Sequence, residues 1–300
     1  MDMIQNKCCR HGASLRRRRR RRRKILRSII FSCSIIAVAV FVAVGSSMIK
    51  SGDGKTNRYD VEAGNNTYDN AVIENSKISG KNKIQNNQSM LDDIMNSTQY
   101  PKQLKDLALK NEEALEFVYD YPAEHVKEHT IDLTEEASMD SVPLFVQWDK
   151  RWGYEKYSGN FFAASGCGPT TLSMVVVYLT HNREASPIAV AKYSKEAGYS
   201  VDGSGSSWTL ISEGCMHYGV KAKAVALDES RMKAELDEGH PIVVNVGPGD
   251  FTDTGHFMVI TGYDDEGFSI NDPNSIEKSG KRWLFRNISS QIRAVWSMYV

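Results

Sequence analysis

The spacing of apolar and polar residues divides the chain into four consecutive segments. Residues 29–49 form an almost continuous apolar run, long enough to cross a bilayer as a helix. Residues 50–89 are rich in Asn, Ser, Gly, Lys and Asp and show no sustained period, which predicts a flexible stalk. Residues 90–140 repeat apolar positions at helical spacing, which predicts a helical linker. Residues 141–300 alternate between helical and strand periods, as a folded domain does.

The helical pattern of the linker starts at Met90 and continues to about His129. We expect an interruption at Pro101 and an end near Pro122, because proline lacks the backbone donor that a helix interior needs. The apolar positions of this segment would either pack on the folded domain or belong to a spacer. Residues 142–148 then predict an extended lead-in to the domain.

Within the folded domain, helices are predicted first and strands later. This order indicates an α+β fold, with a helical part packed on an antiparallel sheet. The first helix contains Cys167 and would have Pro169 at its first helical position. The second would have Ser186 as its N-cap and Pro187 in its first turn. The predicted helices are 167–179, 186–197, 209–218 and 230–238, the predicted strands are 221–227, 241–246, 256–263, 267–271 and 293–300, and 203–207 is a predicted loop.

A sharp charge boundary coincides with the apolar run. The chain holds 37 basic and 37 acidic residues, so its formal net charge is zero. Residues 1–50 contain 13 of the basic residues and one acidic residue, a net charge of +12, which leaves −12 for residues 51–300. An unbroken arginine run at 16–23 precedes the apolar segment, and such a flank stays in the cytoplasm. We therefore expect a basic cytoplasmic tail over 1–28, a transmembrane anchor over 29–49 and an extracytoplasmic domain; nucleic-acid binding by the arginine run is not expected.

The apolar run also admits an interpretation as a cleaved signal peptide. Ala43 and Gly45 place small residues at the spacing that a signal peptidase accepts. Because the preceding segment is long and the run is at the upper limit for a signal peptide, we favour an uncleaved single-pass anchor in the cell membrane. Secretion after cleavage near Gly45 is the alternative. A single span with a stalk suits a bacterial envelope without an outer membrane.

A cysteine between two glycines is the strongest candidate for chemistry. Cys167 opens a predicted helix, where the positive end of the helix dipole favours the thiolate. The glycines at 166 and 168 leave the backbone bare, so a substrate chain could approach. A buried structural cysteine is the alternative, and we assign that role to Cys215. Since the other three cysteines lie before or within the apolar run, no disulfide framework is expected, and no spacing resembles a zinc site.

Two residues farther along the chain are candidate partners of this thiol. His256 begins one predicted strand, and Asp272 follows the next. The turn at 264–267 makes these strands a hairpin, which brings both residues to its open end. There the carboxylate could hold the imidazole in the orientation that a general base needs. The alternatives are a histidine without chemistry and a turn aspartate before Pro273.

Gln147 lies upstream of the cysteine and completes the candidate set. Its side-chain amide could donate a hydrogen bond to a developing oxyanion, beside the backbone amide of Cys167. An ordinary exposed glutamine is the alternative. The remaining histidines are expected to be structural, namely His125, His129, His181, His217 and His240.

Four segments in this order resemble a known family: 145–153, 166–170, 255–263 and 271–273. They resemble the papain-like cysteine peptidases of the bacteriocin-leader-peptidase type, in the stand-alone branch without a transporter fusion. The resemblance covers residues 142–300 and implies a papain-like fold. It implies that Cys167 attacks, His256 is the base, Asp272 orients it and Gln147 serves the oxyanion hole. Unlike the fused members, this chain has one predicted span and no G-x-x-x-x-G-K-[ST] loop.

The expected function is hydrolysis of a peptide or amide bond by a membrane-anchored, extracytoplasmic thiol peptidase without cofactor or metal. An acyltransferase that uses the same thioester intermediate is one alternative, and a non-enzymatic surface binding module is another. A peptide, a peptidoglycan cross-bridge and a small amide are all compatible substrates. The sequence leaves the oligomeric state open.

Overall fold

The computed structural model describes residues 84–300. The predicted tail and anchor, and the predicted stalk up to residue 83, lie outside the described residues. Residues 84–300 all belong to one unit, Tyr68–Val300. Within this range no helix is long and apolar enough to cross a membrane.

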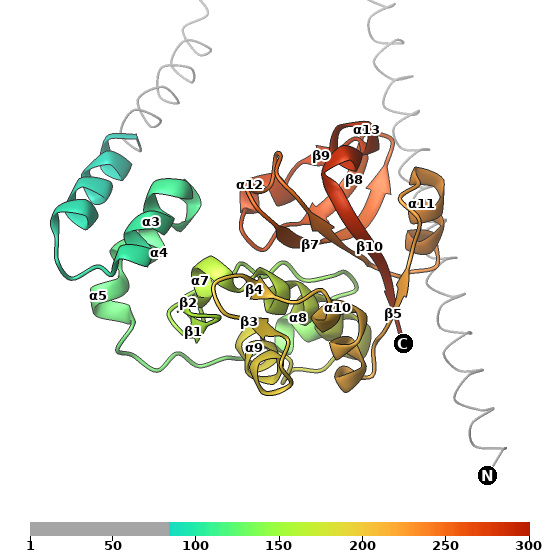
Figure 1. The fold of residues 1–300 in the computed structure, drawn as a ribbon, viewed down its shortest axis with the longest axis horizontal. Helices are drawn as coiled ribbons and strands as arrows, with labels where there is room; N and C mark the ends of the chain where they lie inside the picture. The colour runs from blue at the N-terminus through green and yellow to red at the C-terminus, as the bar shows by residue number, and fades with distance from the viewer. Residues whose placement is uncertain (1–83) are drawn as a thin grey trace, which may run out of the picture. The chain divides into compact units, whose positions relative to one another are not determined.

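An antiparallel sheet forms the C-terminal half of the domain (Figure 1). Its strand order is β5-β10-β6-β7-β8-β9, and every neighbouring pair runs antiparallel. The helices come first and the sheet follows, so the α+β prediction is confirmed. The strands are β5 (Lys221–Ala224), β6 (Ile242–Val246), β7 (His256–Asp264), β8 (Gly267–Asn271), β9 (Arg282–Trp283) and β10 (Ile292–Tyr299).

Both faces of the sheet are covered, which explains why β6 is buried along its whole length. Successive side chains of a strand point to opposite faces. Val243 accordingly belongs to the apolar cluster around α8 (Cys167–Thr180), whereas Ile242 and Val244 belong to the cluster on the other face. That second cluster includes residues of α11 (Glu229–Asp237) and α13 (Phe285–Ile288).

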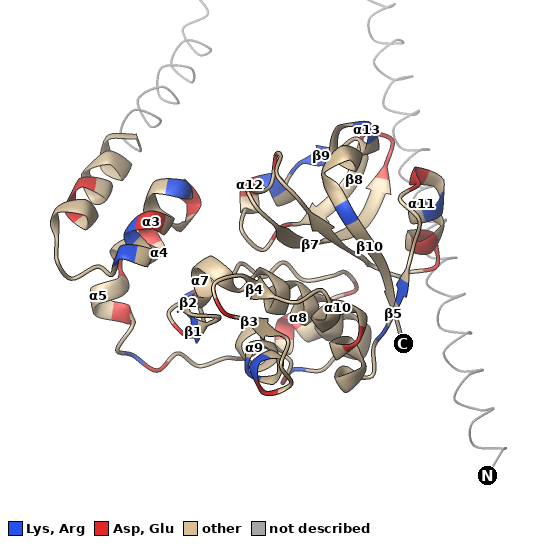
Figure 2. Cartoon of the chain, in the orientation of Figure 1, with Lys and Arg blue, Asp and Glu red and all other residues tan. Residues whose placement is uncertain are grey.

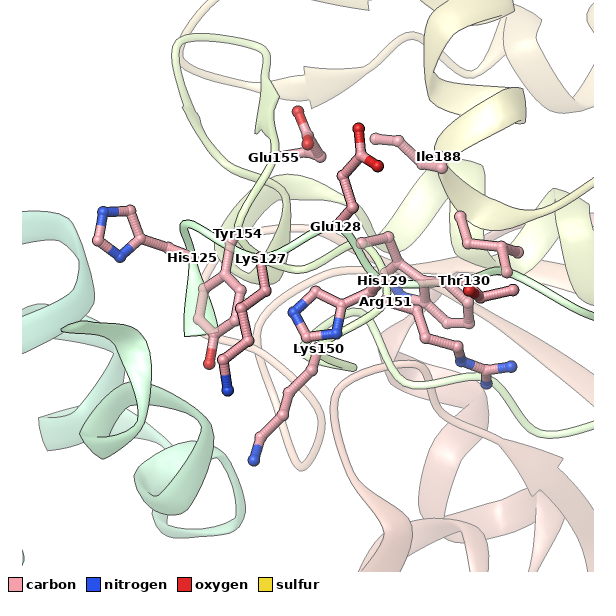
Figure 3. Close-up of a pocket in the computed structure, with 12 residues that line it drawn as sticks. His125, Lys127, Glu128, His129, Thr130, Lys150, Arg151, Tyr154, Glu155 and Ile188 are labelled. Carbon is pink, nitrogen blue, oxygen red and sulfur yellow. The ribbon is translucent and has the colours of Figure 1, made fainter. Parts of the chain in front are cut away.

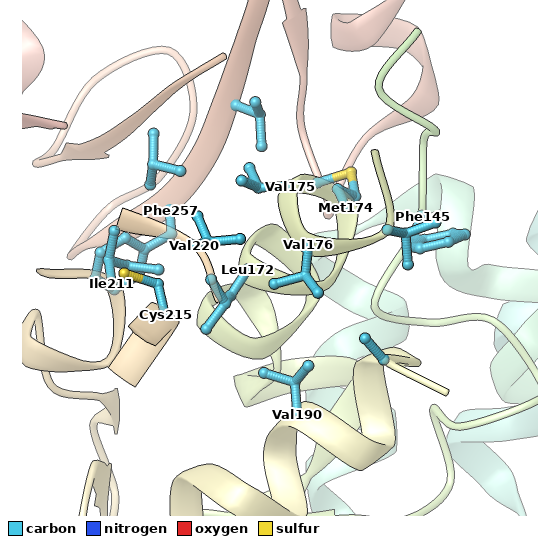
Figure 4. Packing of buried hydrophobic residues seen from close by; sticks show 14 of the residues in the cluster. Phe145, Leu172, Met174, Val175, Val176, Val190, Ile211, Cys215, Val220 and Phe257 are labelled. Atoms are coloured by element: carbon cyan, nitrogen blue, oxygen red, sulfur yellow. The ribbon is translucent and has the colours of Figure 1, made fainter. Parts of the chain in front are cut away.

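The central helix α8 is buried from Gly168 to Val177. It contains no charged residue and packs against β7 and against α9 (Pro187–Glu196). Figure 4 shows Leu172 and Val176 of α8 among the other side chains of this cluster. The sequence predicts Pro169 at the first position of this helix. The helix begins at Cys167, so Pro169 lies at its third position. Proline is tolerated there because the first four amides of a helix have no intrahelical acceptor.

The next helices follow the sequence pattern closely. Ser186 caps α9, its side chain accepting a hydrogen bond from the backbone N–H of Ala189, as the sequence predicts. Asp228 caps α11 in the same way, through Arg231. Gly239 follows α11 with a φ of +83°, a conformation that glycine adopts without strain.

One carboxylate joins α11 to the sheet. Glu235 accepts hydrogen bonds from Ser297 of β10, from Lys223 of β5 and from His240, at 2.8, 3.0 and 3.1 Å. Burial raises the pKa of Glu235, but these hydrogen bonds and the charge of Lys223 outweigh it and lower the pKa to about 2. The carboxylate is therefore held in its charged form.

Several sequence predictions of local structure are wrong in detail. The helix predicted over 209–218 is divided into α10 (Thr209–Ser212) and the 3-10 helix η2 (Gly214–Tyr218), because Glu213 leaves helical geometry with a φ of −127°. Part of the predicted loop 203–207 is a strand, β4 (Gly205–Ser206), and β5 ends at Ala224, before Leu227. Not predicted were β1 (Lys156–Tyr157), β2 (Asn160–Phe161), β3 (Ser200–Val201), which pairs with β4 (Gly205–Ser206), β9, α7 (Phe162–Ser165), α12 (Ile276–Ser279) and α13.

The linker is helical and packs on the domain. Residues 84–96 are already helical, so the part of the predicted stalk from 84 to 89 is wrong. Phe117 stacks on Tyr154 with ring centroids 4.2 Å apart, and Lys150 pairs with Asp120 at 2.6 Å. Figure 2 shows basic and acidic residues on α3 (Lys102–Lys110) of the linker and on α11 of the domain. After 84–96 come α3 (Lys102–Lys110), η1 (Glu112–Ala114), α4 (Leu115–Tyr119), α5 (Tyr121–Glu124), which Pro122 opens rather than ends, and α6 (Thr134–Ser138).

Candidate active site

Cys167 is the first residue of α8 and lines a cleft. The flanking glycines are required by packing. A Cβ at Gly166 would lie 2.6 Å from the ring of Phe162, and one at Gly168 would lie 2.6 Å from the hydroxyl of Ser206. The first-turn amides have no intrahelical acceptor, so the thiol lies beside N–H groups that are free to bond it and beside the positive end of the helix dipole.

His256 and Asp272 meet at the open end of the β7–β8 hairpin. Nε2 of His256 lies 2.6 Å from Oδ1 of Asp272, and both side chains are buried. The same Oδ1 accepts a hydrogen bond from the backbone N–H of Asn274 at 2.8 Å. Oδ2 of Asp272 has no hydrogen-bond partner in the structure. The neighbouring Asn271 instead donates to the main-chain oxygens of the lead-in, at 142 and 143.

The side chain of His256 also hydrogen-bonds the thiol of Cys167. Burial raises the pKa of the Cys167 thiol, but the hydrogen bond and charge of His256 and the backbone N–H groups of Phe257 and Gly168 lower it below its ordinary value. Burial lowers the pKa of His256, yet the charge and hydrogen bond of Asp272, with Cys167, raise it. Both shifts favour a thiolate–imidazolium pair. The aspartate, the imidazole and the thiol thus form one continuous chain of interactions.

Gln147 is buried and is not among the residues that line the cleft. Its backbone N–H donates to the carbonyl of Pro273, next to Asp272, at 2.7 Å. Its Nε2 donates to the carbonyl of Ala163 at 2.7 Å, and its Oε1 has no partner. A primary amide nitrogen carries two hydrogens, so a second donor remains. Gln147 is thus hydrogen-bonded both to the residue after Asp272 and to Ala163, four residues before Cys167.

The cleft at Cys167 has a volume of about 740 Å³. The start of α8, the β3–β4 loop and the β6–β7 loop line it, together with the half-exposed Trp208. Arg293 is the one charged residue among those that line it. Most of the lining is Gly, Ser and Asn, which offers main-chain groups to an extended ligand: Ser158, Gly159, Asn160, Ser165, Gly203, Ser204, Gly205, Ser206, Asn245, Gly247 and Gly255.

The second described cysteine has a different environment. Cys215 is fully buried in the cluster around α8, where Figure 4 shows it beside Ile211. Burial raises the pKa of its thiol to about 11. Neither Cys167 nor Cys215 is in a disulfide. Of the histidines predicted to be structural, His181 bonds the carbonyl of Ala137 and His217 stacks on Tyr193.

A second cavity of about 420 Å³ lies elsewhere and does not include Cys167 (Figure 3). It is lined by residues of 125–131, 150–155 and Ile188. Its cations are already paired within the chain, Lys127 with Glu124, Lys150 with Asp120, and Arg151 with Glu136 and Asp149. Among residues 84–300, no cluster of His, Cys, Asp and Glu is placed to hold a metal ion.

Several groups that shape the site have no signal in the sequence. The backbone N–H of Phe257 reaches the thiol, and Arg293 and the β3–β4 loop line the cleft. The backbone N–H of Asn274 donates to Asp272, and Asn111 of the linker donates to the carbonyl of Asn274. Each of these contacts depends on tertiary packing, so no local pattern indicates it. The asparagine–proline–asparagine surroundings of Asp272 predict only a turn.

The model of the Peptidase_C39 like family matches residues 139–300. No curated protein matches the chain. A similar solved structure is the peptidase domain of Streptococcus ComA, a bi-functional ABC transporter involved in a quorum-sensing pathway: it is 18% identical, has a TM-score of 0.39, and the match covers 53% of this chain and 96% of that one. Another is a protein from Bacillus anthracis described as a C39-like peptidase, 16% identical with a TM-score of 0.34, where the match covers 53% of this chain and 95% of that one. Since the family model spans more than half of the sequence, the chain belongs to the Peptidase_C39 like family and is a cysteine peptidase.

Proposed function

We propose that Cys167, His256 and Asp272 form the catalytic triad of a papain-like thiol hydrolase, with Gln147 at the oxyanion hole. The observation that carries this proposal is the continuous chain from Asp272 through His256 to Cys167, whose pKa is lowered while that of His256 is raised. A thiolate is the nucleophile of cysteine chemistry. The buried, high-pKa thiol of Cys215 has no such partners.

The reaction follows from these positions. The Cys167 thiolate attacks the carbonyl carbon of a peptide or amide, and His256 gives its proton to the leaving amine as the C–N bond breaks. The product is a thioester on Cys167. Water then attacks this thioester, His256 takes up the proton of the water, and the acid leaves as the C–S bond breaks. Asp272 stays ionised and holds the imidazole in one orientation.

The developing oxyanion would be bound by two donors. The backbone N–H of Cys167 has no intrahelical acceptor, because it belongs to the first turn of α8. The second hydrogen of the Gln147 amide is the other candidate, since the first is held by Ala163. Loss of one such donor typically lowers kcat by about 100- to 1000-fold.

The test compares the two described thiols in one molecule. A limiting dose of iodoacetamide is added to the full chain, and the labelled cysteines are identified by peptide mapping. We expect Cys167 to react first and His256→Ala to abolish this preference. Equal labelling of Cys167 and Cys215, unchanged by His256→Ala, would remove the basis for an activated thiol.

We propose further that the peptidase is anchored through residues 29–49 and faces the outside of a bacterial cell. The support is the arginine run at 16–23 directly before the apolar segment. External protease added to intact cells should digest the domain while the tagged N-terminal tail survives. Recovery of a chain that begins near Gly45 from the medium would show secretion instead.

A further inference from the structure

The linker reaches the loop that carries Asp272, although the two are far apart in the sequence. Asn111 donates from Nδ2 to the main-chain oxygen of Asn274 at 2.9 Å and to its Oδ1 at 3.1 Å. The 3-10 helix η1 follows directly and places Glu113 against the next residues of the same loop. Residues 111–113 precede the region that the family model matches, 139–300.

Glu113 binds this loop with both carboxylate oxygens. Oε2 accepts hydrogen bonds from the backbone N–H groups of Ile276 and Glu277, at 2.7 and 3.1 Å. Oε1 accepts a hydrogen bond from the hydroxyl of Ser275. The two amides begin α12 and have no intrahelical acceptor, so Glu113 satisfies donors that would otherwise depend on water. Hydrogen bonds to an ionised acceptor are about twice as strong as neutral ones.

The same loop sets the position of Asp272. The backbone N–H of Asn274 donates to Oδ1 of Asp272 at 2.8 Å, and that oxygen also faces His256 at 2.6 Å. The backbone N–H of Ser275 donates to the carbonyl of Asp272 at 3.2 Å. The indole N–H of Trp148 also donates to the carbonyl of Asn274, at 3.4 Å. A displacement of 274–277 therefore moves the carboxylate that orients His256.

We propose that Glu113 is a positioning residue of the active site, which acts through the 274–277 loop on Asp272 and so on His256 and Cys167. The inference rests on the proposed roles of these three residues. The linker then contributes to the geometry of the active site and is not only a spacer. A misplacement of about 1 Å in a catalytic constellation can cost about 100-fold in rate, so a remote carboxylate can control turnover without touching substrate.

The experiment measures the pH profile of Cys167 alkylation by iodoacetamide in the full chain, with Cys215 as internal reference. Glu113→Ala should lower the rate at Cys167 by about tenfold at about pH 6, below the ordinary thiol pKa of about 8.5, and should leave Cys215 unchanged. Glu112→Ala is the matched control: it is the preceding residue of η1, and its carboxylate accepts from Asn87 at 2.7 Å. Its profile should coincide with that of the wild type.

Glu113→Gln is the second variant, which separates loss of positioning from loss of folding. It keeps the shape and one acceptor oxygen but cannot serve all three donors, so we expect a profile between those of the wild type and Glu113→Ala. A wild-type profile in Glu113→Gln and Glu113→Ala would overturn the positioning role while the triad stands. If instead wild-type Cys167 reacts no faster than Cys215, the triad itself fails and the inference fails with it.

Discussion

Replacing Asp272 by Asn removes the negative charge at the buried end of the His256 hydrogen bond but keeps an acceptor oxygen. Nε2 of His256 and the N–H of Asn274 could still donate to Oδ1, as they do at 2.6 and 2.8 Å. The charge and hydrogen bond of Asp272 are the main causes that raise the pKa of His256. Without the charge, the imidazolium loses stabilisation, and so does the Cys167 thiolate that depends on it.

The size of the effect follows from the difference between a charged and a neutral hydrogen bond. A hydrogen bond to a charged group contributes about 1.5–3 kcal/mol, and a neutral one about 0.5–1.5 kcal/mol. The difference is about 1–1.5 kcal/mol, which corresponds to about 5- to 13-fold in the ratio of ion pair to neutral pair. Asp272→Asn should therefore reduce the thiolate fraction of Cys167 by this factor in the acidic part of its titration.

The ultraviolet absorbance of the thiolate, followed against pH, measures this directly. The signal of Cys167 is isolated by subtracting the titration of Cys167→Ala, which also removes the contribution of Cys215 at high pH. Asp264→Asn is the matched control, because Asp264 lies at the far, exposed end of the same hairpin, where it pairs with Arg282. We expect Asp264→Asn to leave the thiolate titration unchanged.

A folded Asp272→Asn chain whose thiolate titration overlays that of the wild type would show that Asp272 does not lower the pKa of Cys167. Folding is checked by the midpoint of urea unfolding in the same buffer. In that case the lowered pKa of Cys167 would come from His256 and the backbone donors without a contribution from Asp272, and Asp272 would have no electrostatic role.

Three other substitutions test the fold. Glu235 has a folded pKa of about 2, below its ordinary value of 4.5, so it stabilises the protein above about pH 4.5, and this contribution is lost as pH falls toward 2. In urea unfolding, the free energy of unfolding of the wild type should exceed that of Glu235→Gln by about 1–3 kcal/mol at neutral pH and by little at pH 2, and a pH-independent difference would contradict this. Leu172→Ala should lower the free energy of unfolding by about 2–5 kcal/mol because Leu172 is fully buried. Leu109→Ala, at a residue that is 56% exposed, should lower it by about 0.5 kcal/mol, and similar losses in both variants would argue against the α8 core. Gly267→Ala should lower the melting temperature, because Gly267 has a φ of +134° and its Cβ would lie 2.6 Å from a main-chain oxygen, while Gly262→Ala meets nothing within 4 Å; equal melting temperatures would contradict the turn geometry.

The core of the domain could be predicted from the sequence because its signals are local. Ser186 followed by Pro187 marks the start of α9, and an apolar run marks each of β6 and β7. The turn before Gly267 fixes the hairpin, and the hairpin in turn brings His256 and Asp272 to one end. Each step needs only the pattern of neighbouring residues.

The remaining features depend on contacts between distant segments. The short elements α12 and β9 are held by tertiary contacts, such as the hydrogen bonds that the first amides of α12 donate to Glu113, across 163 and 164 residues of sequence. The requirement for glycine at 166 and 168 also depends on tertiary contacts. The sequence suggested an open backbone for substrate, whereas packing against Phe162 and Ser206 requires both glycines. No local pattern reports such neighbours.

The central claim is that Cys167 is the nucleophile of this peptidase. The most direct measurement is cleavage of a peptide library by the full chain, with products identified by mass spectrometry, for wild type, Cys167→Ala and Cys215→Ala. The proposed triad predicts that Cys167→Ala forms no product above background and that folded Cys215→Ala cleaves the same bonds as the wild type. Cleavage of those bonds at the wild-type rate by Cys167→Ala would contradict the claim.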